Sequence, residues 1–129
     1  MSDRPLILLV GHCGPDALTL TAAVKKAALS ARTKRINDNA SLEAELPEAA
    51  LLLINRVLDG DFPAADGVSL IARLRAEHPG APAAILISNY EDAQRRAEAA
   101  GALPGFGKSG ALSRESSDRI RAALAARAS

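Results

Sequence analysis

Aromatic residues are scarce in this sequence of 129 residues, which has two phenylalanines, one tyrosine and no tryptophan. The hydrophobic fraction is still 48%, so the core must be built from leucine, isoleucine, valine and alanine. Proteins that hold single strands of nucleic acid stack bases on aromatic side chains, and nucleic-acid surfaces carry a strong basic excess. With few aromatics and a formal net charge of +1, this chain is not expected to bind nucleic acid.

Cysteine and long apolar runs are scarce as well. The only cysteine, Cys13, excludes an internal disulfide and fits a reducing compartment. No apolar run approaches the roughly 18 residues that a membrane-spanning helix requires. The opening Met1–Pro5 is too short and too acidic for the positive region of a signal peptide. We therefore expect a cytoplasmic protein that does not enter the membrane.

The sequence does contain three uninterrupted apolar runs, and turn-forming or polar residues end each of them. The runs are Pro5–Val10, Ala50–Ile54 and Ala83–Ser88. Continuous apolar runs of this length favour strands that are buried on both faces, as in the middle of a parallel sheet. The segments Thr33–Asn37 and Leu103–Gly107 are weaker strand candidates, so we expect them at the edges.

Helical patterns separate these strands, with apolar residues at helical spacing and polar residues on the opposite side. Five strands that alternate with five helices predict parallel pairing, with helices on both faces of the sheet. One α/β domain is expected to fill residues 1–129. The expected helices are one that begins at Pro15 or Asp16, Ser41–Leu46 with Ser41 as a possible N-cap, Val68–His78, Glu91–Ala100, and one from Ser113 or Ser116 to Arg127.

Polar residues stand where three of the strands end, at Asn55, Ser88 and Lys108. Because the carboxyl ends of parallel strands meet at one edge of the sheet, these side chains are expected to converge. Their order and spacing resemble the receiver domain of bacterial two-component response regulators. The resemblance implies a flavodoxin-like fold with the strands in the order 2-1-3-4-5. It extends from about Leu6 to Leu124 and includes three further motifs, Asp66-Gly67, Ile85–Asn89 and Ala100–Ala102.

The same resemblance implies how such a domain works. In the family, an aspartate at the end of the third strand accepts a phosphoryl group. Two acids after the first strand help to hold Mg²⁺, and a lysine and a hydroxyl hold the phosphoryl oxygens. Ser88 matches the hydroxyl and Lys108 matches the lysine. The acceptor position, however, is Asn55, and the acidic pair falls on Gly11 and His12. A neutral amide cannot form an acyl phosphate as a carboxylate does.

These departures predict a degenerate phosphorylation cleft formed by Gly11, His12, Asn55, Ser88 and Lys108. We expect Mg²⁺ binding to be lost or weak, with no metal site, no other cofactor and no enzymatic activity. The domain would act as a phosphorylation-independent module for signalling and protein interaction. Two alternatives stay open. One is a pseudo-receiver that senses a small anion or metabolite in the former cleft, and the other is a receiver that is phosphorylated at a displaced acid such as Asp59.

Lys108 needs a new partner if the acids around it are gone, because an ammonium without a counter-charge is costly away from water. We expect Asp59 or Asp61, in the loop after the third strand, to pair with it. His12 is expected to fill the space of the missing carboxylate and metal. Cys13 is expected to pack as a small apolar residue.

The resemblance also implies a signalling face. Receivers usually signal through their fourth helix, fifth strand and fifth helix, which span about Glu91 to Arg127 here, and we expect a second copy or another protein to bind there. The aromatic residue of the family's switch falls on Gly105, with Phe106 shifted by one. Three small residues of the fourth helix would let a partner helix approach closely, unless they belong to the core: Ala93, Ala97 and Ala100.

Overall fold

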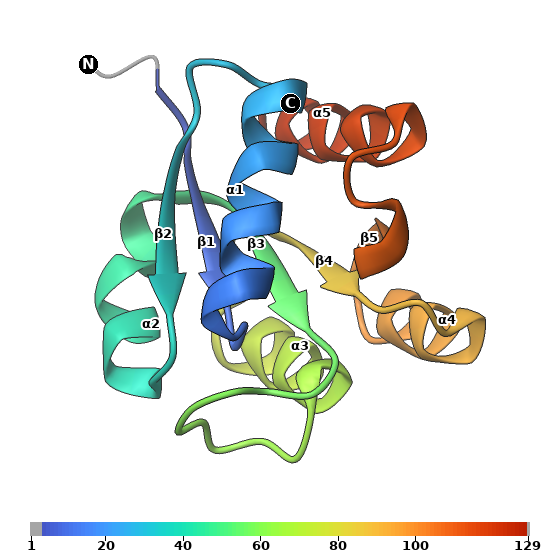
Figure 1. The fold of residues 1–129 in the computed structure, drawn as a ribbon. Helices are drawn as coiled ribbons and strands as arrows, with labels where there is room; N and C mark the ends of the chain where they lie inside the picture. Colours follow the sequence, from blue (N-terminus) through green and yellow to red (C-terminus); the bar gives the residue numbers. More distant parts are fainter. Residues whose placement is uncertain (1–3, 129) are drawn as a thin grey trace.

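The computed structural model describes residues 4–128, which form a five-stranded parallel sheet with helices on both faces (Figure 1). The strands lie in the order β2-β1-β3-β4-β5, which confirms the predicted flavodoxin-like arrangement. The remaining residues of the predicted domain, 1–3 and 129, lie outside the described residues. The strands are β1 (Leu6–Val10), β2 (Arg32–Ile36), β3 (Ala49–Asn55), β4 (Ala83–Ile87) and β5 (Leu103–Phe106).

The helices form a layer on each face of the sheet. Helices α1 and α5 pack on one face, whereas α2, α3 and α4 pack on the other (Figure 1). A short 3-10 helix, η1 (Leu46–Glu48), precedes β3, and a second one, η2 (Lys108–Gly110), follows β5. The α-helices are α1 (Gly14–Ala27), α2 (Asn39–Glu45), α3 (Gly67–Glu77), α4 (Glu91–Ala99) and α5 (Arg114–Ala128). None of the described helices is long and apolar enough to span a membrane.

Alternating side chains along the strands divide the core into two parts. In β1, Leu8 and Val10 belong to the cluster beneath α2, α3 and α4, while Ile7 and Leu9 belong to the cluster beneath α1 and α5. All seven residues of β3 are buried, as its continuous apolar run predicts. Burying a leucine or isoleucine fully contributes roughly 1.5–3 kcal/mol. Because β3 supplies side chains to both clusters, it joins the two helical layers.

Three element boundaries differ from the sequence prediction or decide between its alternatives. Helix α2 is capped by Asp38 and not by Ser41, because the Asp38 carboxylate accepts the Ser41 backbone N–H at 2.7 Å. Helix α5 begins after Ser113, whose hydroxyl oxygen accepts the Ser116 N–H at 3.1 Å. Helix α1 begins at Gly14, slightly before the predicted start.

The Asp66-Gly67 motif brings the start of α3 against the end of β3. The Asp66 side chain caps the helix by accepting the Ser69 N–H at 2.9 Å. At Gly67, a Cβ atom would lie 2.1 Å from the carbonyl oxygen of Asn55, so only glycine fits at this approach. The motif therefore holds α3 next to Asn55, at the edge of the sheet where the strands end.

Candidate functional site

Asn55 ends β3 and is buried, with 6% of the residue exposed. Its side-chain Nδ2 donates to the carbonyl oxygen of Gly11 at 2.9 Å and to that of Val57 at 2.6 Å. Both acceptors are backbone carbonyls, so this position requires a donor that a carboxylate does not have. The amide thereby joins the loop after β1 to the loop after β3.

Gly11 and His12 stand in the loop after β1, where the resemblance implies two acids. Gly11 has a φ of +75°, and a Cβ atom there would lie 2.7 Å from the Leu58 side chain. The His12 ring is fully buried, and its Nε2 donates to the carbonyl oxygen of Leu53 in β3 at 2.8 Å. Burial lowers the pKa of His12 to about 4, against the opposing effect of the Leu53 hydrogen bond. A glycine and a neutral imidazole provide no carboxylate for Mg²⁺.

Lys108 pairs with Asp16, and this corrects the prediction of Asp59 or Asp61 as its partner. The Lys108 Nζ lies 2.6 Å from an Asp16 carboxylate oxygen, in the first turn of α1. The hydrogen bond from Lys108 lowers the pKa of the Asp16 carboxyl below its usual value. An acid in the first turn of a helix also interacts favourably with the helix dipole, so both Lys108 and the dipole stabilise the charged form of Asp16.

The two acids that were expected near Lys108 are engaged elsewhere. The Asp59 carboxylate lies 3.6 Å from the guanidinium of Arg35. The backbone of Asp61 pairs with the segment after β2: its N–H donates to the carbonyl oxygen of Asn37 at 2.9 Å, and its carbonyl oxygen accepts the Asn39 N–H at 3.0 Å. The loop after β3 therefore runs toward β2, away from Lys108.

Three of the predicted cleft residues meet at one small pocket. Asn55, Ser88 and Lys108 line a cavity of about 110 Å³ at the carboxyl edge of the sheet. The other two, Gly11 and His12, are not among its lining residues. The Ser88 hydroxyl oxygen accepts the Tyr90 backbone N–H at 3.1 Å.

Five residues that line this pocket were not predicted from the sequence, and two of them, Arg56 and Tyr90, contact each other. The Arg56 guanidinium lies 4.8 Å from the centre of the Tyr90 ring, a cation–π contact that joins the loops after β3 and β4. Both residues follow polar positions at the ends of neighbouring parallel strands. Their positions after neighbouring strands were the feature of the sequence that could have predicted this contact.

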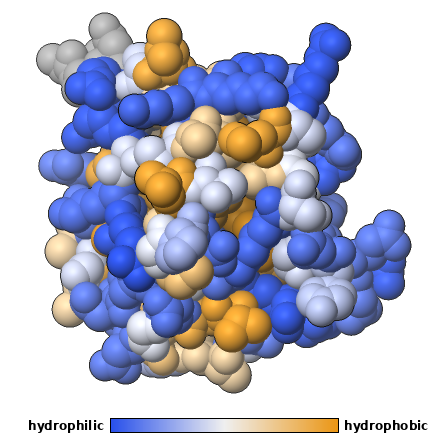
Figure 2. Space-filling view, in the orientation of Figure 1, coloured by the Kyte–Doolittle hydropathy of each residue, from blue (hydrophilic) through white to orange (hydrophobic). Residues whose placement is uncertain are grey.

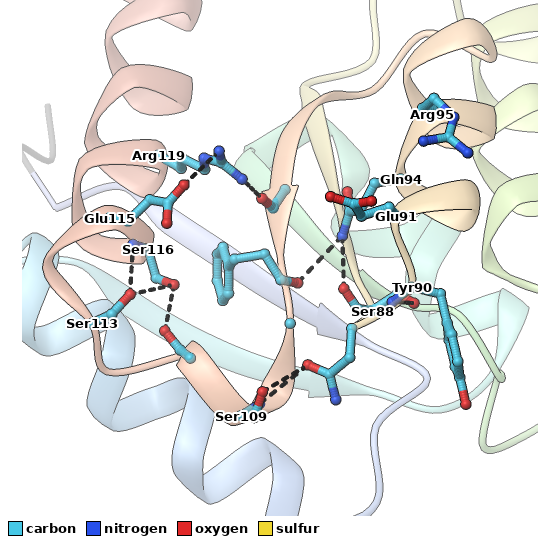
Figure 3. Close-up of a pocket in the computed structure, with 15 residues that line it drawn as sticks. Ser88, Tyr90, Glu91, Gln94, Arg95, Ser109, Ser113, Glu115, Ser116 and Arg119 are labelled. Carbon is cyan, nitrogen blue, oxygen red and sulfur yellow. Dashed lines mark hydrogen bonds and ion pairs between the residues drawn. The ribbon is translucent and has the colours of Figure 1, made fainter.

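A second cavity, of about 450 Å³, opens between α4, β5 and α5 (Figure 3). Gln94 of α4 contacts the strands there, and its Nε2 donates to the carbonyl oxygens of Leu86 at 2.8 Å, Ser88 at 3.1 Å and Phe106 at 3.4 Å. At Gly105, the family's aromatic position, a Cβ atom would lie 2.3 Å from the Leu86 carbonyl oxygen and 2.6 Å from Gln94 Oε1. Gln94 and the β4 backbone leave no room for a side chain at Gly105.

A further side-chain contact lies beside this cavity. The Asn89 carbonyl oxygen Oδ1 accepts the Ser109 hydroxyl at 3.0 Å and so joins the loop after β4 to η2. A Cβ atom on Gly107 would lie 1.8 Å from the same oxygen. Together with Gln94, Asn89 ties the ends of β4 and β5 to each other through side-chain amides.

Solved structures with the same arrangement are response-regulator receivers. The chain is similar to a response regulator from Thermotoga maritima, with 19% identity over 95% of this chain and 98% of that one and a TM-score of 0.73. It is similar to the signal receiver domain of an HD domain-containing protein from Pseudomonas fluorescens Pf-5, with 22% identity over 99% and 92% of the two chains and a TM-score of 0.76. The chain has the receiver fold.

A third receiver of this kind is the non-phosphorylated receiver domain of the stress response regulator RcsB from Escherichia coli. It has 16% identity over 97% of this chain and 95% of that one, with a TM-score of 0.71. No family model and no curated protein matches the sequence. At these identities the comparisons establish the fold, and they confirm the resemblance on which the sequence prediction rested.

On the receiver fold, the face made by α4, β5 and α5 carries charged side chains. Glu91 and Arg95 project from α4, and Glu115 and Arg119 from α5, around the cavity (Figure 3). Arg119 pairs with Glu115 at 2.7 Å and also donates to the carbonyl oxygen of Gly105. Figure 2 shows that hydrophilic residues dominate the visible surface, with separate hydrophobic spots between them.

The small residues of α4 do not belong to this charged face. Ala93 and Ala97 are each 1% exposed and pack in the cluster beneath α2, α3 and α4, with Ala100 against it. They let α4 approach its own sheet, so of the two roles that the sequence left open for them, the structure supports the one in the core.

Proposed function

We propose that this receiver-fold domain is a signalling module that binds a protein partner and does not respond to phosphorylation. One observation carries the proposal: Asn55, at the acceptor position, donates to the carbonyl oxygens of both Gly11 and Val57. A phosphoacceptor needs a carboxylate that points at a metal-bound phosphoryl group. Here the side chain is neutral and turned to the backbone, and the adjacent metal positions hold Gly11 and His12.

The contacts around β5 support the part of the proposal that says the domain does not switch. A receiver that switches must let the ends of β4 and β5 rearrange. In this chain Gln94 bonds to three carbonyl oxygens of those strand ends, and Gly105 has no side chain to move. Such a domain presents one constant surface to its partner.

We place the partner surface on the α4–β5–α5 face. Its cavity of about 450 Å³ combines serine hydroxyls with charged groups of both signs, including Glu91, Arg95 and Glu115. Paired opposite charges give orientation and specificity to an interface more than they give affinity. The partner is a second copy of the chain or another protein with complementary charges.

A second candidate function is the sensing of a small anion in the former cleft. The pocket of about 110 Å³ has two cations at its wall, Lys108 and Arg56, and the Ser88 hydroxyl. The ion pair with Asp16 weakens this candidate, because it already neutralises Lys108. Phosphorylation at a displaced acid is weaker still, since Asp59 pairs with Arg35 and does not line the pocket.

Thermal unfolding with Mg²⁺ and beryllofluoride, which mimics an acyl phosphate, tests the proposal. The expected result is an unchanged midpoint, because nothing in the cleft binds the mimic and a ligand stabilises only a state that it binds. A rise that requires Mg²⁺ would overturn the proposal, and its loss in Asp59→Asn would identify the acceptor. A rise with sulfate or phosphate alone would favour the anion sensor.

The partner surface needs its own test. We would compare binding by the wild type with that of Arg95→Glu and Arg119→Glu, first as self-association in sedimentation at increasing concentration. Reversed charges on the α4–β5–α5 face should weaken association, while Arg73→Glu, on α3, should not. Equal weakening by Arg73→Glu would place the interface elsewhere.

A further inference from the structure

A histidine and two glutamates converge between α2 and the end of α3. They are Glu43 of α2, Glu77 in the last turn of α3, and His78, the C-cap of that helix. One ligand atom from each lies within 4.8 Å of the others. The His78 Nε2 lies 3.0 Å from one carboxylate oxygen of Glu43 and 3.2 Å from the other.

The donor set has a definite chemical preference. One imidazole with two carboxylates suits Zn²⁺ and similar transition-metal ions, whereas Mg²⁺ and Ca²⁺ prefer oxygen ligands alone. Tetrahedral ligands at Zn–N and Zn–O distances of about 2.0–2.2 Å stand roughly 3.3–3.6 Å apart. The separations of His78 from Glu43 are already near that range, and a Glu77 oxygen that lies within 4.8 Å would have to move closer by rotation of its side chain.

The backbone beneath these ligands is well held. The His78 N–H donates to the Leu74 carbonyl oxygen at 2.8 Å, and the His78 carbonyl oxygen accepts the Ala81 N–H at 2.8 Å. On α2, Leu42 is fully buried next to Glu43. Because the backbone at His78 is already fixed, only side-chain freedom is lost there when a metal binds.

The side chains remain open to solvent. His78 and Glu43 are 37% and 40% exposed, so an ion can enter and water can complete its shell. Glu77 has one competing partner, Arg73, at 3.1 Å. An exposed pair of this kind contributes little and gives way to a metal.

We propose that Glu43, Glu77 and His78 form a binding site for a Zn²⁺-class divalent ion that joins α2 to α3. Three donor atoms on two helices, all within 4.8 Å of one another, carry the inference. Helix α3 starts next to the end of β3 and runs back along the sheet, so its last turn lies at the opposite edge from the Asn55 pocket. The metal site is therefore independent of the function proposed above.

Calorimetric titration of the tag-free, chelator-treated protein with Zn²⁺ tests this site. We expect saturable binding of one ion, a higher unfolding midpoint with Zn²⁺, and no such rise with Mg²⁺. His78→Gln should weaken Zn²⁺ binding by at least about tenfold, as should Glu43→Gln. Glu48→Gln, a neighbouring surface glutamate outside the cluster, and Cys13→Ser should bind as the wild type does.

Three results would overturn this proposal, and a measurement of folding is their control. Midpoints measured without metal establish that each variant folds. Absence of saturable Zn²⁺ binding in the wild type overturns the proposal. Equal affinity in the wild type and in folded His78→Gln also overturns it, as does binding that is lost in Cys13→Ser alone.

Discussion

Lys108 and Asp16 form an ion pair with 2.6 Å between the Nζ atom and the carboxylate oxygen. The pair joins η2, at the end of β5, to the first turn of α1. The negative charge beside Lys108 therefore comes from helix α1. The end of β3 has no carboxylate, because Asn55 stands there. Asn55, Gly11 and His12 carry no carboxylate, and Lys108 is neutralised by an acid of α1 instead.

Asp16→Asn should cost about 1 kcal/mol or less, because both partners are partly exposed and such pairs are weak. The pKa of Asp16 is lowered in the folded protein, so the contribution of the pair is complete above the ordinary value of 3.8 and is lost as the pH falls through the folded value. Urea unfolding of both proteins between pH 7 and pH 3 measures this. The difference in stability should be constant near neutrality and shrink below about pH 4.

The same variant should also change anion binding. With Asp16 neutral, Lys108 is free to hold an anion beside Ser88, so sulfate should raise the unfolding midpoint of Asp16→Asn more than that of the wild type. Lys108→Gln in the same background is the control and should remove the difference. Equal responses to sulfate in all three proteins would mean that the pocket does not bind anions at Lys108.

His12 should make the protein sensitive to mild acid. Its folded pKa of about 4 lies below the ordinary value of 6.5, so the unfolded chain takes up a proton first as the pH falls from 6.5. The resulting loss of stability is on the order of 3 kcal/mol by pH 4. His12→Gln, which keeps a donor for the Leu53 carbonyl but does not titrate, should lose less over the same range. Parallel stability curves for the two proteins would show that His12 does not cause the acid sensitivity.

The strands of the sheet could be predicted because each buried strand is marked by a short run of apolar residues in the sequence. The run Ala50–Ile54 is apolar at every position and is bounded by turn residues, as is typical of a strand covered on both faces. The polar residues after the strands then mark the edge where they converge. Asn55, Ser88 and Lys108 do line one pocket there.

The partners of those residues were not predictable, because they depend on how loops cross the edge. Asp59 is near Asn55 in sequence, yet its loop turns toward β2, and Asp16 reaches Lys108 from far along the chain. Gln94 was missed for a similar reason. A glutamine in an alanine-rich helix gives no sign that it will bond to three strand carbonyls.

Gln94→Ala should destabilise the fold by about 1–3 kcal/mol, since it removes the donor from carbonyl oxygens at the ends of β4 and β5. Arg95→Ala, on the exposed side of the same helix, should stay within about 0.5 kcal/mol of the wild type. Chemical denaturation of both variants provides the comparison. If the two substitutions changed the free energy of unfolding equally, the hydrogen bonds of Gln94 would not stabilise the fold.

Gly105→Ala tests the same contact from the strand side. Its Cβ atom would lie 2.3 Å from the Leu86 carbonyl oxygen and 2.6 Å from Gln94 Oε1, so the variant should be less stable than the wild type. In the Gln94→Ala background, part of this cost should disappear, because one of the two clashes is gone. A double-mutant cycle measures that coupling. Strict additivity would mean that Gln94 does not restrict Gly105.

Asn55→Asp should destabilise the protein at neutral pH, even though it introduces a residue type that can accept a phosphoryl group. Its carboxylate would face the carbonyl oxygens of Gly11 and Val57, which now accept hydrogen bonds from the amide, and we expect a cost of about 2–4 kcal/mol. Burial beside these oxygens raises the folded pKa of the new acid, so the penalty is present above that pKa and shrinks as the pH falls through it.

Asn55→Ala is the matched control, because it removes the donor without adding a charge, and its cost should not depend on pH. Urea unfolding of both variants at pH 7 and pH 4.5, with and without Mg²⁺, distinguishes the possibilities. A stable Asn55→Asp whose midpoint rises with Mg²⁺ and beryllofluoride would mean that Gly11 and His12 still permit a metal. Residue 55 alone would then decide whether the cleft binds the mimic. Destabilisation that is relieved by acid and not by Mg²⁺ would mean that the cleft has been rebuilt around the amide, so that restoring the acceptor alone does not restore the site.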